Sequence, residues 1–568
     1  MKYSQMQYIR PDIENLGKDM KKFINDFRNA KTFIQADEIM NSINEIRNEF
    51  SSMKVIAFIN YSNDTNNTEF IGEQDYFDNN DPLYEEQVIE YYKALTESAF
   101  KKELTDKYGR HLFEIADITL KSFCHDIIED KQKENHLCSE YVKLKASAKI
   151  SFKGKELNLQ ELEPYMESAD RDIRHDAFNA YWKFFNDNSK EFDEIFDKLV
   201  YLRNDMAVKM GYNNFKELGY ARMKRMDYDE KMVAGFRESI RRYIVPLAEK
   251  FRMKQSRRLG MDKLMVYDLF LQFRSGNATP KGDPVWVVEK GKIMYDELSP
   301  ETREFYDFMF ENELMNVFSR KGKADMGYCE YIPKYKSPYI FANMNGTDDD
   351  ITVLTHEAGH AFQAYASRNF HFKEYSEPTM ETAEIHSMSM EFLTYPWMKL
   401  FFENETDKFK FSHLSGTVNF LPYGVLVDEF QHWVYENPTA KPSERNSKWR
   451  ELEKIYMPHL NYGDIDYLEN GGRWQKQGHI YEMPFYYIDY CLAQVCAFQF
   501  WSRAIHNGDG EFGKAMKSYI ELCGKGGSKP FLELVKETDL RSPFDENVIK
   551  NLSEEIEEYI DSVDDLNL

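Results

Sequence analysis

Apolar residues recur at three- and four-residue intervals between charged residues over long parts of the chain. This is the spacing of a helix that presents one face to a core. The clearest stretches are residues 31–57, 84–108, 170–211 and 228–258. Only 18 Pro and 27 Gly interrupt the 568 residues, and no repeat of fixed period is found. The pattern predicts a mainly α protein that forms one continuous helical body.

One segment, residues 326–350, departs from the helical pattern. It contains the extended-looking runs YCEYI and PYIFANM, separated by Pro and Lys residues, and then the turn-forming pair Asn-Gly. This combination predicts a small β element, either a hairpin or a short sheet. The acidic run 348–350 suits the amino terminus of a helix that follows directly.

Composition narrows the possible functions. The chain has 73 Lys and Arg against 97 Asp and Glu, a net charge of −24, which disfavours binding to nucleic acid or to an anionic membrane surface. No run of apolar residues reaches the length of a membrane span, and the first residues lack the apolar region of a secretion signal. Six scattered cysteines without a CxxC pair are typical of reduced thiols. We therefore expect a cytoplasmic protein.

The helix after the β segment contains Thr355-His-Glu-Ala-Gly-His360. Residues four apart lie on one helix face, so His356 and His360 are close enough to share one metal ion, most often zinc. Glu357 lies at the edge of that face, where it can take a proton from a water that the metal activates. Two surface histidines on a helix are the alternative, but the apolar flanks favour a buried zinc site. Cobalt or manganese would also suit such donors.

A third ligand is expected from the next helix, which begins after Pro378. Its candidates are Glu381, Glu384 and His386, and spacing alone does not choose among them. Glu391 lies two turns after Glu384 and shares its face. Without the preceding motif, a solvated acidic face would be the better explanation of these glutamates.

A Gly-containing loop at 471–479 leads into a Tyr-rich helix and forms a second candidate constellation. Hydrolysis of a carbonyl group on zinc needs a hydrogen-bond donor for the oxyanion that forms, and an imidazole or a phenol can supply one. His479, Tyr486 and Tyr490 are the candidates, although a Tyr-rich helix is more often core or cleft wall.

Taken together, these stretches resemble the thimet oligopeptidase and oligoendopeptidase F family of zinc metallopeptidases, and above all its oligoendopeptidase F and Pz-peptidase branch. The resemblance extends over roughly the carboxy-terminal two-thirds of the chain and rests on the zinc motif and on four further stretches. These are residues 211–228, 335–347, 384–393 and 479–494.

The resemblance implies roles for individual residues. Glu384 becomes the third zinc ligand, and Glu391 a carboxylate that orients a ligating imidazole. His479 and Tyr490 carry over as groups that bind substrate and stabilise the oxyanion. The alignment slips between Tyr486 and Tyr487, so Tyr486 is taken as catalytic and Tyr487 as substrate-binding.

The resemblance also implies a fold and an activity. We expect an elongated body of two helical lobes around a deep active-site channel, with residues 1–200 as the amino-terminal lobe and 201–568 as the catalytic region. We expect a zinc-dependent endopeptidase that cleaves internal bonds of short unfolded oligopeptides with Glu357 as the base. Peptides are the only partners that the sequence indicates.

Residues 338–346, PYIFANMNG, are a candidate substrate-binding segment. A peptide could add as a strand to an exposed edge there, with Tyr339, Asn343 and Gly346 as binding residues. An ordinary hairpin packed on the helices is the alternative.

Two other functions compete with an endopeptidase. A zinc exopeptidase, either a dipeptidyl carboxypeptidase or a carboxypeptidase, would need a fixed cation for the terminal carboxylate, and Arg473 is a candidate. A non-catalytic, zinc-stabilised peptide-binding protein is the other. Glu357 argues against it, because a structural zinc site needs no base beside the metal.

Overall fold

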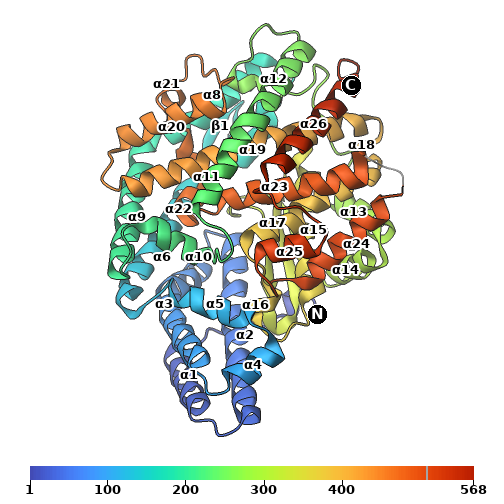
Figure 1. The fold of residues 1–568 in the computed structure, drawn as a ribbon. Helices are drawn as coiled ribbons and strands as arrows, with labels where there is room; N and C mark the ends of the chain where they lie inside the picture. Colours follow the sequence, from blue (N-terminus) through green and yellow to red (C-terminus); the bar gives the residue numbers. More distant parts are fainter. Residues whose placement is uncertain (507–509) are drawn as a thin grey trace.

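The computed structural model describes residues 1–506 and 510–568, and nearly all regular structure in them is helical (Figure 1). The prediction of a mainly α fold is confirmed. In Figure 1 the first helices, drawn in blue, gather at one end of the molecule, and the later helices form the larger body. The amino-terminal helices are α1 (Ile13–Arg28), α2 (Phe33–Asn63), α3 (Thr68–Thr96), α4 (Lys101–Tyr108), α5 (His111–Leu120) and α6 (Ile128–Ala146).

The helices that follow belong to the larger body. The middle of the chain forms α7 (Leu159–Met166), α8 (Arg171–Asp187), α9 (Ser189–Lys209), α10 (Phe215–Arg222), α11 (Glu230–Ser239), α12 (Val245–Leu259), α13 (Pro284–Leu298) and α14 (Pro300–Glu311). The remainder forms α15 (Asp349–Ser367), α16 (Lys373–Ser376), α17 (Met380–Leu393), α18 (Lys399–Phe402), α19 (Thr406–Glu436), α20 (Pro442–Tyr456), α21 (Asp466–Glu469), α22 (Gly478–Glu482), α23 (Tyr487–Trp501), α24 (Phe512–Lys525), α25 (Phe531–Glu537) and α26 (Glu546–Ser562).

Several helices begin at a polar residue that caps the helix. The first N–H groups of a helix have no partner within it, and a side-chain oxygen at the N-cap can accept from one of them. Asp12 caps α1, Thr32 caps α2 and Asn67 caps α3 in this way. Local sequence therefore sets where these helices start.

The predicted β element is a three-stranded sheet, so this prediction is confirmed. It consists of β3 (Met315–Phe318), β4 (Tyr328–Ile332) and β5 (Ser337–Met344) in the order β3-β5-β4. Strand β5 is parallel to β3 and antiparallel to β4. A separate hairpin joins β1 (Ile150–Phe152) and β2 (Lys155–Leu157).

One buried hydrophobic cluster runs through most of the fold and includes residues from Met6 to Ile560. A smaller cluster lies among the amino-terminal helices and reaches Tyr375 in α16. The lobe boundary predicted between residues 200 and 201 falls inside α9 and stays a prediction. Within the described residues, no helix is long and apolar enough to cross a membrane.

Candidate metal centre and active site

Helices α15 and α17 bring three of the predicted ligands together. Nε2 of His356 lies 3.3 Å from Oε2 of Glu384, and Nε2 of His360 lies 3.4 Å from the same oxygen. The helices approach closely at Gly359, where an added Cβ would lie only 2.5 Å from the backbone oxygen of His386. A larger residue there would push Glu384 away from the histidines.

The donor set suits zinc. One atom from each of the three side chains lies within 4.8 Å of the others. Two imidazoles and one carboxylate leave the fourth position of a tetrahedral zinc ion open, as a catalytic site requires. Burial opposes ionisation of Glu384, but the imidazoles of His360 and His356 hold its pKa well below the usual range. The carboxylate is thus kept in the form that ligates a metal.

The other two candidates for the third ligand lie outside this cluster. His386 is 0% exposed, and desolvation by burial lowers its pKa to about 3. Glu381 is 1% exposed, and its pKa is raised by desolvation and by the charge of Asp489. Packing of α17 therefore selects Glu384, a choice that spacing left open.

Glu391 lies between two histidines. Its carboxylate accepts a hydrogen bond from His356 Nδ1 at 2.7 Å, and its other oxygen lies 2.7 Å from Nε2 of His413. His413, on α19, and its partner Tyr395 were not identified from the sequence. They lie 22 and 4 residues beyond Glu391 without any motif that links them to it.

Glu357 lies buried beside the cluster with one oxygen free. It is 6% exposed, and its Oε2 has no hydrogen-bond partner in the described chain. A Cβ added at Gly327, just before β4, would lie 3.6 Å from Oε1 of Glu357. Desolvation raises the pKa of this carboxyl although the imidazoles of His356 and His360 oppose the shift. A raised pKa suits a general base that works near neutral pH.

Of the neighbouring residues Tyr486 and Tyr487, only Tyr486 has a hydrogen bond to the ligand cluster in the described chain. The Tyr486 hydroxyl donates a hydrogen bond to Oε1 of Glu384, and its ring centroid lies 4.9 Å from that of Tyr490. The Tyr487 ring packs against Tyr423 and Phe420 and also lies 5.1 Å from the His479 ring, but no hydrogen bond to Glu384 is found for it in the described chain. Tyr486 is therefore the tyrosine that faces the ligand cluster.

His479 is held as a hydrogen-bond donor toward the tyrosines. The Gln477 amide donates to its Nδ1 at 2.9 Å, so the proton is on Nε2, which lies 3.1 Å from the Tyr490 hydroxyl. Desolvation by burial lowers the pKa of His479 to about 4, which keeps the ring neutral. Tyr423 donates to Gln477 at 2.8 Å and completes this chain.

The loop before Tyr486 is clamped at Phe485, whose φ of 69° lies in the left-handed region. Its backbone oxygen accepts from Arg225, and its N–H donates to the Gln431 side chain at 2.6 Å. Arg225 also pairs with Asp489 at 2.9 Å, and both side chains are fully buried. This clamp sets where α23 begins and hence where Tyr486 points.

The prediction that the segment 338–346 offers an exposed strand edge is wrong. Strand β5 is the central strand, because β3 pairs in parallel on one side and β4 pairs on the other. Tyr339 is 3% exposed and packs on Tyr3, and the Asn343 amide donates to the backbone oxygens of Ala324 and Met326. The Gly346 N–H donates to Asp350 at 2.9 Å. The edge strands of this sheet are β3 and β4.

Arg473 is engaged elsewhere. Its guanidinium lies 3.5 Å from the carboxylate of Glu453 and stacks over the ring of Tyr423 at 4.9 Å. It therefore has a fixed partner before any peptide binds.

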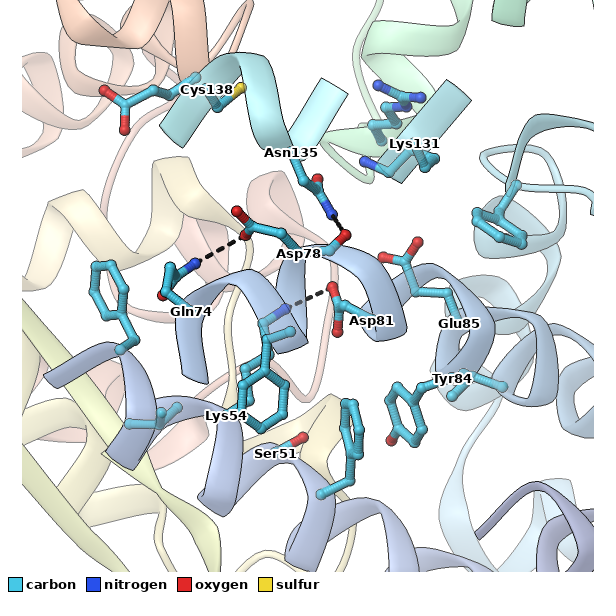
Figure 2. A pocket seen from close by; sticks show the side chains of 18 of the residues that line it. Ser51, Lys54, Gln74, Asp78, Asp81, Tyr84, Glu85, Lys131, Asn135 and Cys138 are labelled. Atoms are coloured by element: carbon cyan, nitrogen blue, oxygen red, sulfur yellow. Dashed lines mark hydrogen bonds and ion pairs between the residues drawn. The ribbon is translucent and has the colours of Figure 1, made fainter. Parts of the chain in front are cut away.

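A large cavity lies between the amino-terminal helices and the elements of the site. Its volume is about 760 Å³, in the range of small-molecule and peptide sites. Helices α2 and α3 line it, as Figure 2 shows for Lys54, Asp81 and Glu85. Met326 and Glu330 of the β4 region also line it.

A helix-borne HExxH sequence with a downstream glutamate, set in a helical body, is the pattern of the metallopeptidase class. The comparisons agree: residues 164–280 and 299–554 match the model of peptidase family M3, and residues 3–123 match the peptidase M3 N-terminal domain. The chain belongs to peptidase family M3. The resemblance to oligoendopeptidase F is confirmed at the level of the family.

Individual relatives support this assignment. A solved structure titled Pz peptidase A with an inhibitor is 50% identical, with a TM-score of 0.98 over 100% of both chains. Group B oligopeptidase PepB of Streptococcus agalactiae is 21% identical over 63% of this chain and 58% of its own length. The oligoendopeptidase F homolog of Lactococcus lactis is 22% identical over 65% of this chain and 60% of its own. The matches thus span about three-fifths of the length of these two relatives.

Proposed function

We propose that the chain is a zinc-dependent endopeptidase that cleaves internal bonds of short, unfolded oligopeptides. The observation that carries this proposal is the position of Glu357. Within residues 1–506 and 510–568, a buried carboxylate with an unpartnered oxygen lies beside a cluster of three possible protein ligands. A structural zinc site would normally be closed by a fourth protein ligand.

Zinc held by His356, His360 and Glu384 would polarise the scissile carbonyl and lower the pKa of water toward neutrality. Glu357 takes the proton from the attacking water and passes it to the leaving amine. His479 donates through Nε2, with Tyr490 and Tyr486, to the oxygen that becomes negative in the transition state. Glu391 keeps His356 in the tautomer that presents Nε2 to the cluster.

The substrate backbone is expected along β4. This strand pairs with β5 on one side only, so the N–H and C=O groups of its other side are available to an extended peptide. Gly327 brings the start of the strand next to Glu357. Binding through backbone groups suits a peptidase that accepts many short sequences. We also propose that the site lies in a deep channel between two helical lobes and that the protein is cytoplasmic.

Chelator-sensitive hydrolysis tests the proposal. The substrate is a quenched fluorescent peptide of about nine residues, blocked at both ends so that only internal cleavage separates the dyes. We expect cleavage that stops with 1,10-phenanthroline and returns when zinc is added. Absence of cleavage by the zinc-loaded protein, or cleavage only of peptides with free ends, would contradict an endopeptidase.

A further inference from the structure

A line of hydrogen-bonded side chains connects Tyr423 on α19 to His479 on α22 and then to Tyr490 on α23. The Tyr423 hydroxyl donates to Oε1 of Gln477 at 2.8 Å, and Nε2 of Gln477 lies 2.9 Å from Nδ1 of His479. Nε2 of His479 lies 3.1 Å from the Tyr490 hydroxyl oxygen. The proposed mechanism uses His479 and Tyr490 but leaves Gln477 and Tyr423 without a role.

Gln477 is the member of this line whose direction of hydrogen bonding is fixed by its chemistry. A phenol hydroxyl can donate or accept, and a neutral imidazole can carry its proton on either ring nitrogen. An amide donates only through its nitrogen and accepts only through its oxygen. Because the amide nitrogen of Gln477 lies against Nδ1 of His479, that ring nitrogen must accept, and the imidazole proton is left on Nε2.

Charges at the two ends of the line favour this direction. The guanidinium of Arg473 lies 4.9 Å from the centre of the Tyr423 ring. At the other end the Tyr486 hydroxyl, whose ring lies 4.9 Å from that of Tyr490, donates to the carboxylate of Glu384. A cation behind the first donor and an anion beyond the last orient the dipoles between them. An amide turned the other way would direct its N–H groups toward Tyr423 and the cation, against this field.

Burial keeps His479 neutral, so the position of its one proton decides what the ring can do. Desolvation lowers its pKa to about 4, and the charged groups that act on it are Glu384 on α17 and Lys145 on α6. Around it lie three aromatic rings from the start of α23, those of Tyr486, Tyr487 and Tyr490. With the proton on Nδ1, Nε2 could only accept, and the ring could not donate to a substrate oxygen.

We propose that Gln477 is a positioning residue that keeps the imidazole proton of His479 on Nε2, and that Tyr423 holds the Gln477 amide in the orientation this requires. The inference rests on the proposed peptidase function, in which His479 is a donor to the oxyanion. Gln477 and Tyr423 act through His479 and not on the substrate.

Gln477→Glu should reverse the preference of the ring. Its carboxylate accepts from Nδ1, so a neutral His479 keeps its proton there and loses it from Nε2, whereas a doubly protonated ring still donates through Nε2. Relative to the wild type, kcat should therefore fall as the pH rises through the pKa of His479 in the variant. We expect a fall of about a hundredfold, the effect of losing one oxyanion donor, with KM and zinc content close to the wild-type values.

Gln477→Met separates positioning from packing. Methionine removes the donor to Nδ1 without offering an acceptor, so kcat should fall by about tenfold at most, as for one neutral hydrogen bond, and by the same factor at every pH. Tyr423→Phe should have a smaller effect of the same kind. If Gln477→Glu and Gln477→Met lower kcat by the same factor at every pH, Gln477 serves only packing and the proposal is overturned.

Nitrogen NMR on protein with isotope-labelled histidines locates the proton without any substrate. The His479 signals, among those of 13 histidines, are the ones missing from the spectrum of His479→Gln. We expect the proton on Nε2 in the wild type and, at high pH, on Nδ1 in Gln477→Glu. A wild-type proton on Nδ1, or one that stays on Nε2 in Gln477→Glu at high pH, would overturn the proposal.

Gln499→Met is the control. Gln499 lies on α23, as Tyr490 does, and its amide also makes two hydrogen bonds, to the backbone oxygen of Arg541 at 3.0 Å and from its N–H at 2.8 Å. Its loss should leave the pH profile of kcat and the position of the His479 proton unchanged. A change in either would show that any loss of an amide near α23 has the effect assigned to Gln477.

The outcomes separate this inference from the proposed function. If the zinc-loaded wild type cleaves no blocked peptide, the peptidase proposal fails, and the NMR measurement still locates the proton. If the wild type cleaves the peptide but Gln477→Glu has the pH dependence of Gln477→Met, only the positioning role fails.

Discussion

Nδ1 of His356 donates to Oε1 of Glu391 at 2.7 Å, and this contact ties the first histidine of the metal cluster to a buried chain of hydrogen bonds. Glu391 also binds Nε2 of His413, whose Nδ1 lies 2.7 Å from the Tyr395 hydroxyl. Because Nδ1 of His356 carries the proton, its Nε2 lone pair is directed at the cluster. A contact between two helices thus decides the tautomer of a ligand.

Loss of this contact should weaken metal binding. Glu391→Gln is expected to lower zinc affinity by about 10- to 100-fold, because an amide cannot hold both imidazoles as the carboxylate does. Competition with a chromophoric chelator measures the affinity. The control is Glu377→Gln, which removes a half-exposed carboxylate whose partner is Lys373. Equal affinities for Glu391→Gln and the wild type would exclude an orienting role.

Glu357→Gln should separate metal binding from catalysis. The variant keeps the shape of the side chain but cannot take a proton, so kcat should fall by about a hundred- to ten-thousandfold while zinc content stays at one per chain. Kinetics on the quenched peptide and atomic emission on the same sample provide both values. A variant that cleaves at the wild-type rate would rule out Glu357 as the base.

Two neighbouring glutamates on α17 should behave differently. Glu384→Ala removes a donor of the cluster and should abolish stoichiometric zinc, whereas Glu381→Ala should retain it because Glu381 lies outside the cluster. Metal analysis after dialysis distinguishes them. Loss of zinc in Glu381→Ala, with Glu384→Ala still loaded, would reverse the assignment.

The clamp at Phe485 predicts a distant effect on activity. In Gly219→Ala the new Cβ would lie 2.6 Å from the Phe485 ring, so the loop that carries Tyr486 must shift. We expect a stability loss of about 1–3 kcal/mol and a lower kcat with zinc retained. Gly235→Ala in α11 is the matched control. An added Cβ there has nothing within 4 Å, so this substitution should leave the stability unchanged or raise it. Full activity in Gly219→Ala would show that the loop position does not matter.

A buried ion pair between α2 and α16 predicts acid sensitivity. Arg47 lies 2.7 Å from Glu374. Burial opposes ionisation, but Arg47 and a hydrogen bond from Tyr92 lower the pKa of Glu374 to about 2 from its usual 4.5. Because the folded-state pKa is depressed, the carboxylate stabilises the fold above about pH 4.5, and this stabilisation is lost as the pH falls toward 2.

From this pKa shift, ionised Glu374 and its partner Arg47 stabilise the folded state by at most about 3 kcal/mol. The melting temperature of Glu374→Gln should therefore lie well below that of the wild type at pH 7, and the difference should shrink below pH 4.5. Glu90→Gln, which breaks the exposed pair with Arg28, is the control and should change little at any pH. If the melting temperatures of the wild type and Glu374→Gln differ by the same amount at pH 7 and below pH 4.5, the pKa of Glu374 is not depressed in the folded state.

The sequence by itself determined what depends on neighbours along the chain. Helical periodicity predicted the mainly α fold, and the four-residue spacing of His356 and His360 predicted that they share a face, since one turn of helix brings them together. Only the tertiary structure decided which of Glu381, Glu384 and His386 meets them, because that depends on how closely α15 and α17 pack at Gly359.

The sheet and the hydrogen-bond partners depended on tertiary structure in the same way. The runs 328–332 and 337–344 both have the pattern of a strand, and only the parallel pairing with β3 makes β5 the central strand and leaves β3 and β4 at the edges. His413 reaches Glu391 from another helix. Local patterns determine elements, whereas contacts between residues far apart in the chain exist only once those elements have packed.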